Sequence, residues 1–164
     1  TWGNHDFVGL PRWQHEVPEE LFGYAATFAI DELIEVQGLK IYLYPWVPNL
    51  DKWAFGFPED VPSGIVSKIP EGLDILVSHG PPTGYFDETL TLKENRFGDF
   101  TEGHVGSENL LAVIRKQKPK IVICGHIHEG RGEKIPDWGG MIYNVASLDR
   151  MYQPYPERFT RIEI

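Results

Sequence analysis

The sequence predicts a mixed α/β layered sandwich, and three observations support this fold class. Short apolar runs bounded by turn residues recur along the chain, as expected of strands. The segment 107–118 has the apolar periodicity and capping residues of a helix. In the second half the predicted order is strand, helix, strand, which is typical of domains that pack helices against a sheet.

Three strands are expected in the first part of the chain, at residues 27–30, 33–36 and 39–44. Gln37 and Gly38 separate the last two and form a suitable tight hairpin turn, because glycine adopts positive φ without strain. A shorter helix at 18–24 is also predicted, although Gly23 weakens it.

Two later runs, 73–78 and 120–124, are apolar at successive positions, which predicts strands buried on both faces. Each of them leads directly into a histidine-containing turn. Further strands are predicted at 141–146 and 159–164. The long segments 49–63 and 80–106 are rich in Gly, Pro and aromatic residues, and loops of this length are often functional.

The helix at 107–118 has a signal at each end. Ser107 is suited to cap its N-terminus, and Glu108 favours the positive end of the helix dipole. Basic residues occupy its last turn, and Pro119 ends it. Between these ends, apolar residues at helical spacing predict one buried face.

The composition indicates one soluble globular domain across residues 1–164. The formal net charge of −9 argues against general nucleic-acid binding, which requires Lys and Arg to neutralise phosphates. The sequence contains no apolar run long enough to span a membrane. The single Cys124 cannot form an internal disulfide, so a cytoplasmic location is expected. The oligomeric state is not indicated.

Three short blocks contain the residues that point to chemistry, namely Gly-Asn-His-Asp with Asn4, His5 and Asp6, Ser-His-Gly-Pro-Pro with His79, and Gly-His-Ile-His-Glu with His126 and His128. Each block alone has a structural explanation, because Asn and Asp favour turns and a histidine often ends a strand. Together they predict one metal site built from loops at strand ends. Imidazole ligands suit manganese, iron, zinc or nickel.

The ordered set of blocks resembles the calcineurin-like metallophosphoesterases, and the segments 44–48 and 104–111 are similar to the small phosphodiesterase-type members. This resemblance implies an α-β-β-α sandwich, with two mixed sheets flanked by helices. It also implies two divalent metal ions, with manganese foremost. The resemblance assigns Asn4, His79 and His126 to the second metal and His128 to the first.

The same resemblance implies a phosphodiesterase reaction in which a hydroxide activated by both metals attacks phosphorus in line. His5 would donate a proton to the leaving group, and Asp6 would orient His5. The expected substrate is a small phosphodiester or nucleotide, and His104 is a candidate substrate contact.

The chain departs from the family pattern in one respect. The Asp-x-His and Gly-Asp blocks that precede Gly-Asn-His-Asp in the family are absent, so the N-terminal strands of the sandwich are expected to be missing. We therefore interpret the chain as the C-terminal portion of a metallophosphoesterase domain. Two alternatives stay open, a non-catalytic calcineurin-like fold used for protein binding and a truncated, inactive fragment.

Overall fold

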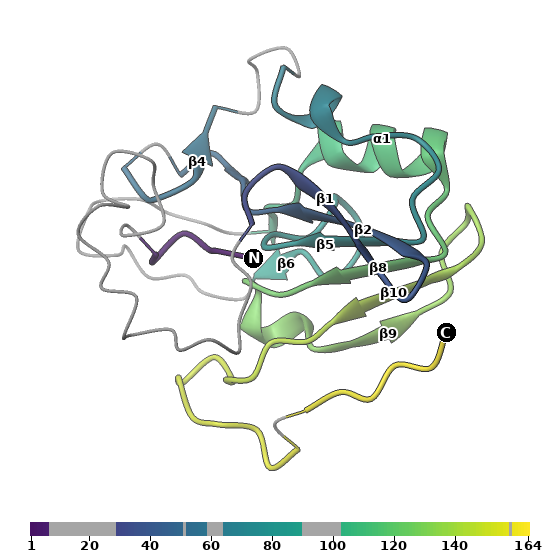
Figure 1. Ribbon diagram of the computed structural model, residues 1–164. Coiled ribbons are helices and arrows are strands. Elements are labelled where there is room, and N and C mark those ends of the chain that lie inside the picture. Colours follow the sequence, from purple (N-terminus) through teal and green to yellow (C-terminus); the bar gives the residue numbers. More distant parts are fainter. Residues whose placement is uncertain (7–28, 51, 59–63, 90–102, 158) are drawn as a thin grey trace, which may run out of the picture.

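A six-stranded mixed sheet organises the computed structural model, which describes residues 1–6, 29–50, 52–58, 64–89, 103–157 and 159–164 (Figure 1). The strand order is β1-β2-β5-β8-β10-β9. The four central strands, β2, β5, β8 and β10, are parallel to one another, whereas β1 and β9 pair antiparallel at the two edges. The strands are β1 (Glu32–Val36), β2 (Leu39–Tyr44), β5 (Ile75–Ser78), β8 (Ile121–Cys124), β9 (Gly132–Lys134) and β10 (Met141–Asn144).

The predicted hairpin is confirmed by β1 and β2. Gln37 and Gly38 connect these strands with φ values of 53° and 81°. Two successive positive φ values match the type I′ turn, whose twist suits a two-residue hairpin.

The face of the sheet that carries Tyr42, Leu76, Val122 and Ile142 packs against helix α1 (Glu108–Gln117). These four side chains lie in register on adjacent strands, so they form one apolar stripe across the sheet. Leu110 and Ile114 of α1 are each 1% exposed and complete this core. The short 3₁₀ helix η4 (Val66–Lys68) contacts α1 on the same side.

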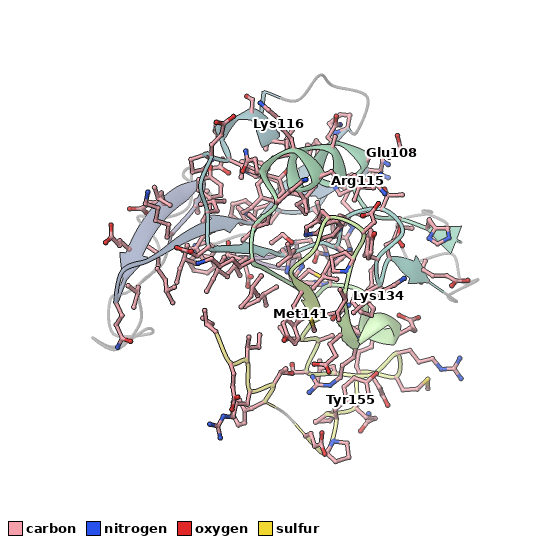
Figure 2. The ribbon with its side chains drawn as sticks, turned by 90° about the vertical axis from the view of Figure 1, so that its right-hand side faces the viewer. Glu108, Arg115, Lys116, Lys134, Met141 and Tyr155 are labelled. Carbon is pink, nitrogen blue, oxygen red and sulfur yellow. The ribbon has the colours of Figure 1, made fainter. Side chains whose placement is uncertain are left out.

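Both predicted ends of α1 are confirmed. The Ser107 hydroxyl accepts a hydrogen bond from the Leu110 N–H at 3.0 Å, as an N-cap should. Lys118 adopts a left-handed conformation and donates its N–H to the Ile114 carbonyl, so the helix ends before Pro119. Figure 2 shows Glu108 and Lys116 toward opposite ends of the helix.

The opposite face of the sheet carries Ile75, Ile121 and Tyr143. The C-terminal stretch runs along this side, away from α1, and Ile162 packs against it (Figures 1 and 2). The prediction of a strand at 159–164 is wrong, because these residues pair with no strand in the described part of the chain. Phe159 is 92% exposed, so β-propensity without a pairing partner was not sufficient.

The structure differs from the predicted strands in several further parts of the chain. Ala29 and Ile30 are not in a strand, while residues 27 and 28 and the predicted helix at 18–24 lie outside the described residues. Strand β9 was not predicted, because its three residues have no apolar alternation and depend on pairing with β10. The two long segments contribute short ladders, of β3 (Val47–Pro48) with β4 (Gly56–Phe57) and of β6 (Glu88–Thr89) with β7 (Gly103–His104).

The mixed α/β fold class is confirmed, with a single large mixed sheet in the part of the chain that the structure describes. None of the described helices has the length and apolar character needed to cross a membrane.

Candidate metal centre

The candidate site lies at the carboxyl ends of the central parallel strands. His79 directly follows β5, and His126 and His128 follow β8. Parallel strands end at the same edge of a sheet, so their following loops meet there. The N-terminal residues of the chain lie beside this edge (Figure 1). The three sequence blocks therefore come together in space.

The side-chain oxygen of Asn4 is the meeting point of two predicted ligands. His79 Nε2 lies 2.9 Å and His126 Nδ1 lies 3.1 Å from Asn4 Oδ1. The two imidazole rings are 5.0 Å apart between centroids. Because an amide oxygen only accepts hydrogen bonds, both ring nitrogens act as donors to it. Asn4 is 5% exposed, so the oxygen at the centre of this polar cluster is shielded from solvent, whereas the two rings are only partly buried.

The surroundings of these rings keep them neutral. Burial lowers the pKa of His79 to about 4, against a partly opposing effect of Asp6. Burial lowers the pKa of His126 to about 3, with further lowering by repulsion from His79, His128 and His5. Neutral imidazole is the charge state that binds metal, so at pH 7 neither side chain has to lose a positive charge, and only the ring proton that faces Asn4 must leave its nitrogen when a metal binds.

His126 itself sits in an unusual backbone conformation. Its φ is 66°, and the Ile127 N–H donates to the Gly125 carbonyl at 2.7 Å, which closes a three-residue turn around it. Positive φ in a non-glycine residue costs energy and persists only where the surroundings enforce it. The positive φ of His126 therefore determines where its ring lies, and neighbouring residues must stabilise this turn.

Asn144, at the end of β10, holds this turn from behind. Its Nδ2 donates to the Ile127 carbonyl at 2.8 Å, and its Oδ1 accepts from the Ala146 N–H at 2.9 Å. Its 1% exposure means that neither bond competes with water. Sequence reasoning missed Asn144, because an asparagine at a strand end has no pattern that separates it from an ordinary turn residue.

We expect Asn144→Ala to lower the free energy of unfolding by about 1–3 kcal/mol, because it leaves a buried carbonyl and a buried N–H without partners. It should also loosen the His126 turn. Urea unfolding measures the first effect, and the chemical shifts of His126 report the second. Gln153→Ala, which removes an exposed amide, serves as the control. Equal stability of the Asn144 variant and the control would contradict the assigned role.

The contacts of Gly3 explain why a glycine begins the first block. A Cβ atom at Gly3 would lie 2.3 Å from His79 Cε1, so only glycine leaves room for the imidazole ring. The Gly3 N–H donates to Asp6 Oδ2 at 2.7 Å, which closes the turn that contains Asn4 and His5. The Asn4 carbonyl accepts from the Ala54 N–H at 3.1 Å and fixes the same turn to the β3–β4 loop.

His5 is exposed beside this cluster, with its ring edge-on to Trp53 at 4.7 Å between centroids. Asp6 makes its side-chain hydrogen bond to the Gly3 backbone, as a turn-forming aspartate does. The catalytic roles of His5 and Asp6 stay predictions.

His128 begins the short 3₁₀ helix η5 (His128–Gly130) and has its own set of contacts. Its Nδ1 lies 2.9 Å from the Asp149 carbonyl oxygen. Its ring packs edge-on against Tyr152 at 5.0 Å between centroids. The contacts of His128 are therefore made with the C-terminal stretch, and not with Asn4.

His104 lies on β7, where its side chain is 63% exposed. Its Nδ1 is 2.9 Å from Asp87 Oδ1, and this carboxylate raises the pKa of His104. Both residues line a pocket of about 320 Å³ that reaches Glu129 and Gly130, next to His128. The predicted ligands Asn4, His79, His126 and His128 are not among the residues that line this pocket, so the role of His104 as a substrate contact stays a prediction.

The donor atoms fit a divalent transition metal. Two adjacent ligands of a six-coordinate ion with bonds of about 2.1 Å are separated by about 3 Å. The Asn4–His79 and Asn4–His126 separations of 2.9 and 3.1 Å agree with that spacing. Among the described residues, His, Cys, Asp and Glu side chains alone form no metal-binding group of three or more. The cluster thus reaches three donors only through the Asn4 amide oxygen.

The chain is similar in sequence to known proteins. A family model described as calcineurin-like phosphoesterase matches residues 1–130. The human and mouse proteins called metallophosphoesterase domain-containing protein 1 are each 38% identical over 127 residues, which is 76% of this chain and 36% of theirs. A UPF0046 protein of Caenorhabditis elegans is 36% identical over 110 residues, covering 65% of this chain and 25% of its own. The chain spans about a third of the length of these relatives or less.

Proposed function

Since the chain belongs to the calcineurin-like phosphoesterases, a family of metal-dependent phosphoesterases, we propose that it carries part of a phosphodiesterase centre with two divalent metal ions. One observation supports this most strongly. His79 Nε2 and His126 Nδ1 converge on Asn4 Oδ1 at 2.9 and 3.1 Å, although these residues are far apart in the sequence. A cluster of two neutral imidazoles and an amide oxygen is well suited to bind a metal ion and has no evident value for packing.

Asn4, His79 and His126 would hold one ion, and His128 would belong to the other. The nitrogen and oxygen donors suit manganese, iron, zinc or nickel, and we place manganese first because the family resemblance implies it. Bound divalent ions would polarise the phosphoryl oxygens and supply a nucleophile at neutral pH.

The proposed contribution of His5 is proton transfer to the leaving oxygen. It directly follows Asn4, so the turn that places the ligand also places the proton donor. Its ring is exposed to an incoming substrate, and the edge contact with Trp53 limits its rotation. Such a group contributes about 10²–10⁴-fold to a rate.

The pocket beside η5 supports a small substrate. Its volume of about 320 Å³ is at the lower end of the range typical of small-molecule sites. His104 lines it together with the carboxylates of Asp87, Glu88 and Glu129, and Asp87 favours the protonated form of His104. Within this acidic lining the His104 imidazolium is the group proposed to donate to a phosphate oxygen. The net charge of −9 disfavours long nucleic acids. We therefore propose a small phosphodiester or nucleotide as substrate.

Cys124 supports a proposed cytoplasmic location. It is free and buried at the end of β8, and burial raises the pKa of its thiol to about 12. A thiol of this kind is inert and packs as a small apolar side chain.

We expect His79→Ala to abolish high-affinity Mn²⁺ binding, whereas His5→Ala should leave the affinity within about 3-fold, since His5 is not a ligand. His5→Ala should instead lower the rate of hydrolysis of bis(p-nitrophenyl) phosphate by about 10²-fold or more. Isothermal titration calorimetry measures the affinities, and p-nitrophenol release measures the rate. The matched pair separates metal binding from proton transfer.

Two outcomes would contradict this proposal in different ways. Unchanged Mn²⁺ affinity in His79→Ala would mean that the converging side chains are not the metal site. Tight Mn²⁺ binding without hydrolysis of any phosphodiester, in the wild type as well, would contradict a phosphodiesterase activity of this chain and would favour one of the two alternatives, a non-catalytic binding role or an inactive fragment.

A further inference from the structure

The turn at residues 149–153 is built around one aspartate. Asp149 Oδ1 accepts hydrogen bonds from the Met151 N–H at 2.8 Å and from the Gln153 N–H at 2.9 Å. The Asp149 N–H donates to the Gln153 carbonyl at 2.8 Å. An aspartate that bonds to the backbone of the following residues forms an Asx-type turn and fixes the direction of its own carbonyl.

That carbonyl is directed at a predicted metal ligand. The Asp149 carbonyl oxygen accepts from the Tyr152 N–H at 2.9 Å and lies 2.9 Å from His128 Nδ1. A carbonyl oxygen has two lone pairs and can accept both bonds, but it cannot donate. His128 must therefore carry its proton on Nδ1, and its Nε2 lone pair is left for another partner. The hydrogen bond of one ring nitrogen determines which nitrogen can bind a metal.

Further contacts hold the same stretch against His128. Tyr155 donates its hydroxyl proton to the His128 carbonyl at 3.1 Å. The Arg131 guanidinium donates to the Ala146 and Glu157 carbonyls, and it lies 5.1 Å from the centre of the Tyr155 ring. Figure 2 shows Tyr155 on the C-terminal stretch. The stretch is thus tied down on both sides of the Asp149 turn.

The backbone of Tyr152 supports a specific role for the turn. Its φ of 59° is in the left-handed region, where Gly or Asn is preferred, yet a tyrosine occupies the position and packs its ring on His128. Tyr152 is 66% exposed, so burial does not account for this conformation. A backbone in a costly conformation beside a functional group indicates that its placement matters.

We propose that Asp149 is a positioning residue, whose turn orients His128 and fixes its tautomer so that Nε2 is the nitrogen presented to the metal. This inference rests on the proposed function, because it takes His128 as a ligand. It assigns a role in the site to the C-terminal stretch, and residues 131–164 lie outside the span that the family model matches.

The test is the tautomer of His128, read from imidazole ¹⁵N and ¹³Cδ2 chemical shifts of the metal-free chain at pH 8.5. We expect a single Nδ1–H tautomer in the wild type and in Asp149→Asn, because asparagine keeps the Oδ1 acceptor. Asp149→Ala removes that acceptor and should give a mixture with the Nε2–H form. Arg150→Ala changes an exposed neighbour in the same turn and should leave the single tautomer unchanged.

A single Nδ1–H tautomer in Asp149→Ala would overturn the proposal, as would an Nε2–H form in the wild type. If Asp149→Ala does not fold, the wild-type spectrum still shows whether His128 carries its proton on Nδ1 or on Nε2. Titration with Zn²⁺ then separates this proposal from the proposed function. We expect Zn²⁺ to shift the resonances of His79 and His126 in the wild type and to about the same extent in Asp149→Ala, because Asn4, His79 and His126 would hold the other ion. If Zn²⁺ shifts no histidine resonance, the metal site fails, whereas the tautomer result stands or falls independently.

Discussion

Gly3→Ala is expected to weaken Mn²⁺ binding by about 100-fold or more, although Gly3 contributes no ligand atom. The added Cβ would lie 2.3 Å from Cε1 and 2.6 Å from Nδ1 of His79. The ring must then rotate away, which breaks its 2.9 Å contact with Asn4 and removes one of three donors. Displacing a ligand costs more than the roughly 10–100-fold typical of changes in the residues that support ligands. Calorimetric titration with Mn²⁺ measures the loss.

Gly80→Ala provides the matched control for this experiment. Gly80 is the next residue after His79, and the nearest neighbours of a Cβ there would be side-chain atoms of Val47 at 3.5, 3.6 and 3.9 Å. These are ordinary van der Waals distances, so we expect nearly unchanged metal affinity in Gly80→Ala. Equal affinities in the Gly3 and Gly80 variants would show that the position of the His79 ring does not determine binding.

The metal-free protein is expected to lose stability steadily as the pH falls from 7 to 5. The pKa values of folded His79 and His126 are about 4 and 3, below the ordinary imidazole value of 6.5. In this pH range the unfolded chain takes up protons that the folded protein does not, so acid favours unfolding. One such histidine contributes a slope of up to about 1.4 kcal/mol per pH unit, so the upper limit for two histidines between pH 7 and 5 is about 4 kcal/mol. We expect roughly half of this loss, because both rings keep some contact with solvent.

Urea unfolding at a series of pH values measures this slope. The variant His79→Gln/His126→Gln lacks both titrating groups and should show a flatter dependence between pH 7 and 5. The comparison is confined to this range because carboxylates such as Asp74 and Asp137, whose pKa values are lowered by Lys120 and Arg115 respectively, contribute only at more acidic pH. A wild-type stability that does not change from pH 7 to 5 would contradict the burial of the two rings.

Local sequence patterns were sufficient to predict those turns and helix ends whose conformation depends only on their own residues. The hairpin at Gln37-Gly38 and the limits of α1 were predicted because turn and cap chemistry is local. The strand at 159–164 was wrong and β9 was missed because pairing depends on a neighbouring strand. Similar apolar content therefore led to a strand at 141–144 and to an unpaired stretch at the C-terminus.

The residues of the candidate site also separate into those that the sequence predicts and those that only the structure identifies. The order of the three histidine blocks was enough to identify the family and its candidate ligands, because ligand chemistry depends on residue type. It could not indicate that Gly3 makes room for His79, that Asn144 holds the His126 turn, or that Asp149 orients His128. Each of these contacts joins residues that are distant in the chain, or depends on a backbone direction that only the packed strands establish. Residue types thus define which atoms can bind a metal, and the parallel strands decide which of them meet and which nitrogen each presents.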